Sequence, residues 1–162
     1  MFREMRRKRQ ALPSPDCKEI LSRRSAGVLA VAGDDDYPYA VPLSYWYDGA
    51  RLYFHCAKSG HKLDAIARNP KASFCVVDKD EIVPEEYTSY FRSVIAFGRV
   101  RIVEEDAQKR AAIEALALKY APHSAAADRA EAIDRDWAPL CILEMAVEHL
   151  TGKEAIELAK QR

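Results

Sequence analysis

The sequence of 162 residues predicts a mostly β protein, a small and mainly antiparallel barrel with helices at its periphery. About six segments have the β-branched and aromatic composition of strands, and most of them lie in the middle of the chain. Asp48-Gly49 separates two of these segments and is a strong hairpin signal. Only one link between strands before residue 100 has a helical pattern, whereas a parallel βαβ array needs a helix at nearly every link. Together these features favour an antiparallel barrel.

The predicted strands are short runs of apolar residues bounded by turn residues. They cover residues 27–32, 39–47, 51–56, 71–78, 91–103 and 141–150. Pro42 removes one ladder N–H group, so its strand is expected at a sheet edge or a bulge. Gly98 is expected to allow a kink or bulge in the fifth strand. The polar stretch 79–89 is interpreted as a loop.

Four segments carry helical signals. They cover residues 13–24, 61–69, 105–120 and 127–137. Ser14 is a candidate N-cap for the first, followed by Pro15 at the first helical position, and Asn69-Pro70 ends the second. TGKE at residues 151–154 resembles part of a phosphate loop but lacks the upstream glycines, so it is interpreted as a turn with Lys153 as a minor ligand candidate.

The bulk composition predicts one domain over residues 1–162, with a basic N-terminal arm (1–12) and a helical segment (104–136). Lys plus Arg equals Asp plus Glu, 25 each, which argues against a dedicated nucleic-acid binder. The arm is interpreted as solvated, with nucleic-acid or membrane contact as the alternative. No stretch has the length of a membrane span, and the four cysteines form no CxxC pair. We therefore expect reduced thiols in a cytoplasmic protein.

The segment FHCAKSGHK, residues 54–62, gathers two histidines, a cysteine and two lysines. His55, Cys56 and His61 are metal-ligand types, but neighbours on a strand point to opposite faces and no fourth ligand is near in sequence. No metal site is therefore predicted. Nearby lysines could lower the pKa of Cys56, yet a thiol nucleophile also needs a positioned base, and a small buried side chain is the commoner role of a free cysteine.

An anion site is the remaining interpretation of this segment. Ser59 is a candidate N-cap for the helix that follows, and the first turn carries His61 and Lys62. Positive charge at that position opposes the helix dipole, and a bound phosphate would offset it. The alternative is that these side chains simply extend into water, and the residues alone leave both open.

The ordered series YPYAVPLSYWYDGARLYFHCAKSGHKLDAIARNPKASFCVV, then FRSVIAFGRVRI, then LTGKEAI resembles the flavin-binding split barrels of the pyridoxamine-5′-phosphate-oxidase-like superfamily, nearest to its nitroimidazole-resistance branch. The resemblance implies a six-stranded Greek-key barrel and a homodimer with FMN at its interface. It also implies candidate cofactor-binding residues, namely Val41, Pro42, Leu43, Ser44, Cys56, Ser59, His61, Lys62, Arg92 and Ser93. Of these, Ser59, His61 and Lys62 match the phosphate-binding positions, and His55 matches a histidine at the flavin and substrate pocket.

These features predict an FMN-dependent oxidoreductase that passes electrons from NADH or NADPH to a small organic acceptor, a nitro-aromatic compound or a quinone. His55 would donate a hydrogen bond or proton to the acceptor, and Trp137 could stack on the flavin. The segment LTGKEAIELAKQR lacks the arginine-rich substrate motif of the true oxidases, so oxidation of pyridoxamine phosphate is not expected. The alternative function is a non-catalytic protein that stores or senses flavin or haem.

Overall fold

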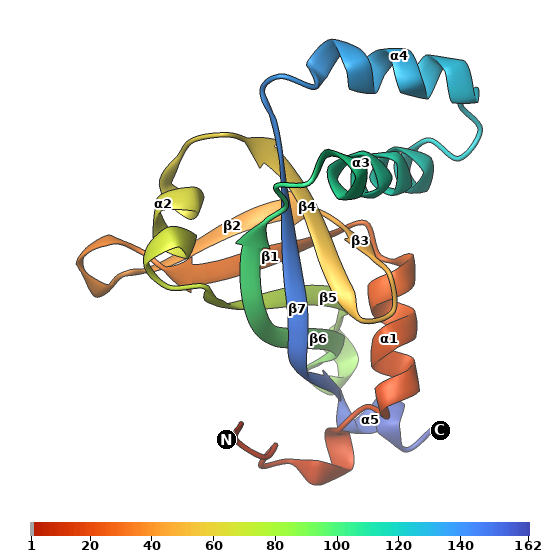
Figure 1. Cartoon of the computed structure of the whole chain (residues 1–162). Coiled ribbons are helices and arrows are strands. Elements are labelled where there is room, and N and C mark those ends of the chain that lie inside the picture. Colours follow the sequence, from red (N-terminus) through yellow and green to blue (C-terminus); the bar gives the residue numbers. More distant parts are fainter. Residues whose placement is uncertain (1) are drawn as a thin grey trace.

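The computed structural model describes residues 2–162, whose strands form one antiparallel sheet in the order β2-β1-β5-β6-β7-β4-β3 (Figure 1). The strands are β1 (Ala26–Ala32), β2 (Pro38–Ser44), β3 (Trp46–Tyr47), β4 (Arg51–Ala57), β5 (Lys71–Val83), β6 (Thr88–Ile102) and β7 (Leu140–Glu154). Every recorded strand pairing is antiparallel. The predicted class, a mostly β split barrel with peripheral helices, is confirmed.

The two ends of the sheet meet at Tyr45, the single residue between β2 and β3. Before Tyr45 the chain pairs with β1, and after it the chain pairs with β4. The predicted strand 39–47 is therefore split in two, which is why the sheet has seven strands rather than the predicted six. Tyr45 is fully buried, and α3 holds it in place: Lys119 Nζ donates to its carbonyl oxygen at 2.9 Å and its N–H donates to the Tyr120 hydroxyl at 2.9 Å.

The predicted hairpin at Asp48-Gly49 is confirmed. Asp48 Oδ1 accepts hydrogen bonds from the N–H groups of Ala50 at 2.8 Å and Arg51 at 2.7 Å, and Gly49 has φ of +103°. A positive φ is readily adopted by glycine, so this residue allows the tight link between β3 and β4.

The polar loop predicted at residues 79–89 is wrong, because β5 continues to Val83 and β6 begins at Thr88. Both strands run past the barrel as a paired ribbon with Tyr87, 98% exposed, at its tip. Two other expectations are confirmed. Pro42 lies on an edge strand, and the β6–β7 register shifts between Phe97 and Gly98, as at a bulge.

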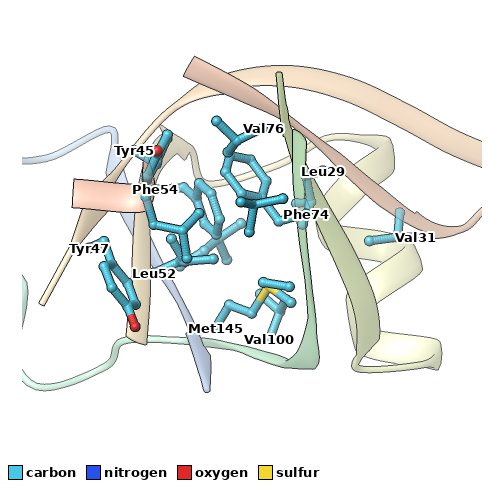
Figure 2. Packing of buried hydrophobic residues seen from close by; sticks show 14 of the residues in the cluster. Leu29, Val31, Tyr45, Tyr47, Leu52, Phe54, Phe74, Val76, Val100 and Met145 are labelled. Atoms are coloured by element: carbon cyan, nitrogen blue, oxygen red, sulfur yellow. The ribbon is translucent and has the colours of Figure 1, made fainter. Parts of the chain in front are cut away.

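The barrel interior is filled by side chains from alternate positions of its strands (Figure 2). Phe74 of β5 lies at its centre, with its ring 5.0 Å from that of Phe54 and 4.9 Å from that of Tyr45. Leu29, Leu52 and Met145 are also fully buried. Buried side chains therefore fill the interior of the barrel, as in other small barrels.

The helices are α1 (Ser14–Arg23), α2 (His61–Arg68), α3 (Asp106–Tyr120), α4 (Ala126–Asp136) and α5 (Ile156–Ala159), with 3₁₀ turns η1 (Lys8–Gln10), η2 (Asp34–Asp36) and η3 (Pro84–Glu86). In Figure 1, α3 lies against the barrel and α4 lies outside α3, while α1 and α5 cover one end of it. No helix within residues 2–162 is long and apolar enough to cross a membrane.

Three details of the predicted helices and turns are wrong. Ser14 forms no side-chain cap, because α1 already includes it and Pro13 occupies the cap position. Residues 151–154 are not a turn: they belong to β7 and pair with β6. The short helix α5 follows them and was not predicted.

Candidate functional site

The N-terminus of α2 lies directly after the end of β4, and it has no side-chain cap. Gly60, with φ of +131°, occupies the cap position, so the prediction that Ser59 caps the helix is wrong. Leu63, Ala65 and Ile66 are buried and fix α2 against the barrel. The first N–H groups of a helix have no partner within the helix, so this end of α2 presents free donors and the positive end of the helix dipole.

Lys62 and His61 add positive charge at this end but have different surroundings. Lys62 is half-buried, and no ion pair within residues 2–162 includes it. His61 Nε2 lies 3.5 Å from Asp34 Oδ2 in η2, and its ring lies 4.1 Å from that of Tyr39 in β2. From sequence alone, Asp34 and Tyr39 are predicted only to lie in a turn and a strand, because their contacts with His61 depend on how η2 and β2 pack against α2.

The four candidates on β2 lie along a strand that pairs on one side only, with β1. These residues are Val41, Pro42, Leu43 and Ser44. Val41 and Leu43 are half-buried and pack against the core, whereas Pro42 and Ser44 are exposed. The unpaired side of an edge strand carries free backbone N–H and C=O groups, which can bind a polar ring through the main chain.

His55 and Cys56 lie on opposite faces of β4, as expected for neighbours on a strand. Cys56 is directly opposite Cys141 of β7. Burial and the neighbouring Cys141 raise the pKa of the Cys56 thiol to about 12, although the charge of Lys62 acts in the other direction. A thiol with this pKa is protonated at neutral pH, so the geometry does not favour a nucleophilic role. His55 is exposed and lines a pocket of about 440 Å³ below α3 and α4.

Arg92 and Ser93 lie far from α2 within one chain. Arg92 pairs with Glu154 at the C-terminal end of β7, whereas Cys56 pairs with Cys141 at its N-terminal end. The Arg92 guanidinium also forms ion pairs, with Glu154 Oε2 at 3.0 Å and Asp78 Oδ2 at 3.5 Å. The structure therefore does not bring these two candidates together with the phosphate candidates.

Trp137 follows α4, and its ring is covered by cations of α3. Lys109 Nζ lies 4.0 Å from the ring centroid and Arg110 Cζ 4.8 Å from it. Lys109 Nζ also donates to the Trp137 carbonyl oxygen at 3.0 Å. These contacts stabilise the α3–α4 segment, and they occupy ring surface that flavin stacking would need.

Comparison with known proteins places this geometry in a family. The sequence profile of the pyridoxamine 5′-phosphate oxidase family matches residues 13–154. An uncharacterized protein of Rhizobium meliloti (strain 1021) is 32% identical over 88 residues, which are 49% of this chain and 54% of that protein. The chain thus matches about half the length of this curated relative.

Several solved structures share the fold. A candidate 5-nitroimidazole antibiotic resistance protein of Bacteroides thetaiotaomicron VPI-5482 aligns with a TM-score of 0.73 at 20% identity, over 89% of this chain and 86% of its own. A conserved hypothetical protein of Mycobacterium tuberculosis aligns with a TM-score of 0.79 at 17% identity, over 93% and 90%. An FAD-binding protein of Mesorhizobium loti aligns with a TM-score of 0.67 at 25% identity, over 90% and 97%. With the profile match over residues 13–154, these alignments confirm the predicted resemblance, and the chain belongs to the pyridoxamine 5′-phosphate oxidase family.

Proposed function

We propose that the chain binds FMN and uses it as an oxidoreductase that transfers electrons from NADH or NADPH to a small organic acceptor. The observation that carries the proposal is the uncapped N-terminus of α2 with Lys62 beside it and no ion pair to that lysine within residues 2–162. Membership in the family and the similarity to an FAD-binding protein of Mesorhizobium loti support a flavin as the ligand.

The residues at this end of the barrel fit a flavin phosphate. Free N–H groups, a helix dipole and an ammonium group together favour a doubly charged anion. Gly60 has open space where a side chain would project, so the helix end can be approached closely. Lys62, His61 and the amides near Ser59 would hold the phosphate. The free backbone edge of β2, from Val41 to Ser44, would bind the polar side of the flavin ring.

We also propose a homodimer, because one chain does not gather all the candidate residues. Arg92 and Ser93 lie at the opposite end of β7 from the α2 site, and a second copy would let each flavin contact both groups. An apolar row crosses the outer face of the sheet and would suit the contact between copies. It is formed by directly paired residues of β2, β1, β5 and β6, namely Pro42, Val28, Cys75 and Ile95.

The bound flavin would supply the electron transfer, and the chain would bind it, orient it and place a proton donor near the acceptor. His55 is the candidate donor, since it is exposed at a pocket and an imidazole can hold or release a proton near neutral pH. Nitro-aromatic compounds are the acceptor class that we propose to test first, because the fold is shared with a candidate nitroimidazole resistance protein.

The first test adds FMN to the purified chain, removes the excess and measures the flavin absorbance that remains. The second test measures the consumption of NADH and of NADPH by the loaded chain in the presence of a nitroimidazole. We expect one FMN per chain and turnover. His55→Gln should keep the flavin and lower kcat, whereas His123→Gln, an exposed histidine between α3 and α4, should change neither. Flavin binding without turnover would support a storage or sensing protein instead, and a chain that does not retain FMN would contradict the proposal.

A further inference from the structure

We propose that the tip of the β5–β6 ribbon of one copy binds in a basic pocket formed by the N-terminal arm and the start of α5 of a second copy. The pocket has a volume of about 470 Å³ and is lined by Arg6, Arg7, Lys8, Arg9, Gln10 and Ile156. This inference rests on the proposal that two copies associate. It assigns a contact between them that includes none of the candidate flavin residues.

The pocket carries positive charge that its own chain does not neutralise. Its three arginines are exposed, and no ion pair includes them within the described residues 2–162. Lys8 differs, since its Nζ lies 2.9 Å from Glu4 Oε2. Glu157 of α5 is near in sequence but does not line the pocket. The pocket therefore favours a ligand with negative charge.

Gln10 and Ile156 add two further requirements. Gln10 is 5% exposed, and its Oε1 has no hydrogen-bond partner within the part of the chain that the structure describes. A buried acceptor without a partner is costly, so a hydrogen-bond donor that enters the pocket and meets a rotated Gln10 amide is favoured. Ile156 and the alkyl parts of the arginine side chains provide apolar surface. The ligand that fits best is an apolar group with a hydroxyl group and neighbouring carboxylates.

The tip of the ribbon has this combination of groups. Tyr87 is 98% exposed and directly follows Glu85 and Glu86. Neither of these carboxylates forms an ion pair within residues 2–162. Lys79 is the only basic residue in the stretch 79–89, and its Nζ lies 2.7 Å from Glu81 Oε2. The negative charge at the tip is therefore available to a basic partner.

Both edges of the ribbon are also free of other strands. β1 pairs with β5 only at residues 72–75, and β7 pairs with β6 only from Arg92 onward. Residues 80–83 and 88–91 therefore pair only with each other. A ribbon with two free edges can lie against another copy of the chain.

The tip lies away from the pocket of its own chain. The Ala155 N–H donates to the Phe91 carbonyl oxygen at 2.9 Å, so the base of the ribbon is fixed beside the start of α5. Tyr87 lies beyond Phe91 by about 13 Å of extended strand, and its high exposure shows that it packs on nothing in its own chain. A twofold axis that sets two ribbons antiparallel would place each tip beside the base of the other ribbon, and hence at the other pocket.

In this arrangement the contact forms twice, because each copy contributes one tip and one pocket. The Tyr87 ring packs on Ile156 and the arginine side chains, and its hydroxyl donates to Gln10 Oε1. Glu85 and Glu86 pair with the guanidinium groups of the arm.

The first experiment measures the dissociation constant of the dimer of the full-length chain by sedimentation velocity, at low salt and without flavin. Tyr87→Asn removes the ring at a residue with φ of +51°, which asparagine tolerates. We expect this variant to raise the dissociation constant by about tenfold or more. Tyr37→Asn, at an exposed tyrosine of the β1–β2 turn, should leave it unchanged.

The second experiment reverses the charges on each side of the contact. The ribbon variant carries Glu85→Arg with Glu86→Arg, and the arm variant carries Arg6→Glu with Arg7→Glu. Each variant alone should dimerise at least about tenfold more weakly than the wild type, because like charges then meet at both contacts. A mixture of the two should form a heterodimer, since the reversed ribbon faces the reversed arm and the native ribbon faces the native arm.

The matched control carries Glu114→Arg with Glu131→Arg, at exposed positions of α3 and α4, and has the same net charge as the ribbon variant. Mixed with the arm variant, it should not restore association. A wild-type chain that stays monomeric would overturn this contact together with the proposed homodimer. A dimer that Tyr87→Asn does not weaken, or equal recovery in the two mixtures, would overturn this contact alone. The proposal on FMN is unaffected by any of these outcomes, because the assay contains no flavin.

Discussion

His61 at the start of α2 lies beside Asp34 of the β1–β2 turn, with Nε2 and Oδ2 3.5 Å apart. The same carboxylate contacts Arg68 at the other end of α2, where Oδ1 and Nη2 are 2.6 Å apart. Asp34 thus neutralises part of the positive charge of this helix when no ligand is bound. A phosphate at the N-terminus of α2 would compete with Asp34 for His61.

Replacement of Asp34 by asparagine should therefore tighten FMN binding. Loss of one exposed, competing carboxylate should lower the dissociation constant by about two- to fivefold. The matched control is Asp35→Asn, since Asp35 lies in the same turn, forms no ion pair within residues 2–162, and has φ of +52°, which asparagine tolerates. Titration of both variants at low salt measures the effect. Weaker binding by Asp34→Asn than by Asp35→Asn would show that Asp34 supports the site rather than competing with it.

Asp78 should control the stability of the end of the barrel that holds Arg92. Its side chain is 3% exposed and lies 2.6 Å from Nη2 of Arg23 and 2.6 Å from Nε of Arg24. Burial alone would raise the pKa of Asp78, but hydrogen bonds from Arg24 and Arg23 and their charges outweigh burial and hold the pKa below its usual range. Asp78→Asn should lower the free energy of unfolding by about 2 kcal/mol at neutral pH, because three guanidinium groups lose a partner.

The pH dependence of this effect has a definite sign. A carboxyl group with a lowered pKa in the folded state stabilises the fold above its unfolded pKa of about 4, and this contribution is lost as the pH falls through the folded pKa. Urea unfolding from pH 7 to pH 2 should show a steeper loss of stability for the wild type than for Asp78→Asn. Glu19→Gln serves as the control, since that carboxylate pairs with Arg23 at the surface and is 76% exposed. If the free energy of unfolding falls in parallel with pH for the wild type and Asp78→Asn, then Asp78 does not have a lowered pKa in the folded state.

The contact between α3 and Tyr45 should stabilise the seam of the barrel, the place between β2 and β3 where the two ends of the sheet meet. Tyr120→Phe removes the hydroxyl that accepts from the Tyr45 N–H and donates to the Ser25 carbonyl oxygen, and it leaves a buried N–H without a partner. We expect a loss of about 1–2 kcal/mol in the free energy of unfolding. Tyr37→Phe, at a tyrosine that is 76% exposed, should cost nothing measurable by urea unfolding. Equal stability of the two variants would mean that the seam does not depend on α3.

Local patterns in the sequence predicted most of the elements but not how the barrel closes. Residues 39–47 have the composition of one continuous strand, and nothing in them indicates a change of pairing partner at Tyr45. That change is stabilised by Lys119 and Tyr120, which are distant in sequence. The ribbon formed by residues 79–89 was missed for a related reason. Its charged residues are typical of a loop. They adopt strand structure because β5 and β6 pair with each other up to Val83 and Thr88.

The candidate site was predicted in part. The positive charge at residues 61–62 left an anion site and a solvated patch both open, and the structure shows the uncapped helix end that an anion site requires. The position of Arg92 came from the family resemblance alone, which does not reveal its buried partners Glu154 and Asp78. Asp34 was missed because its contact with His61 depends on the packing of a turn against a helix.

The claim that the N-terminus of α2 holds the flavin phosphate is tested most directly by titrating FMN into the Lys62→Ala variant. The quenching of flavin fluorescence reports binding in this titration. Lys62 is the one cation at the start of α2 for which no ion pair is found within residues 2–162, so its loss should weaken FMN binding by about tenfold or more. Lys18→Ala, at an exposed lysine of α1, should bind FMN like the wild type. If Lys62→Ala folds and binds FMN as tightly as Lys18→Ala, then α2 does not hold the flavin phosphate and the proposed site is wrong.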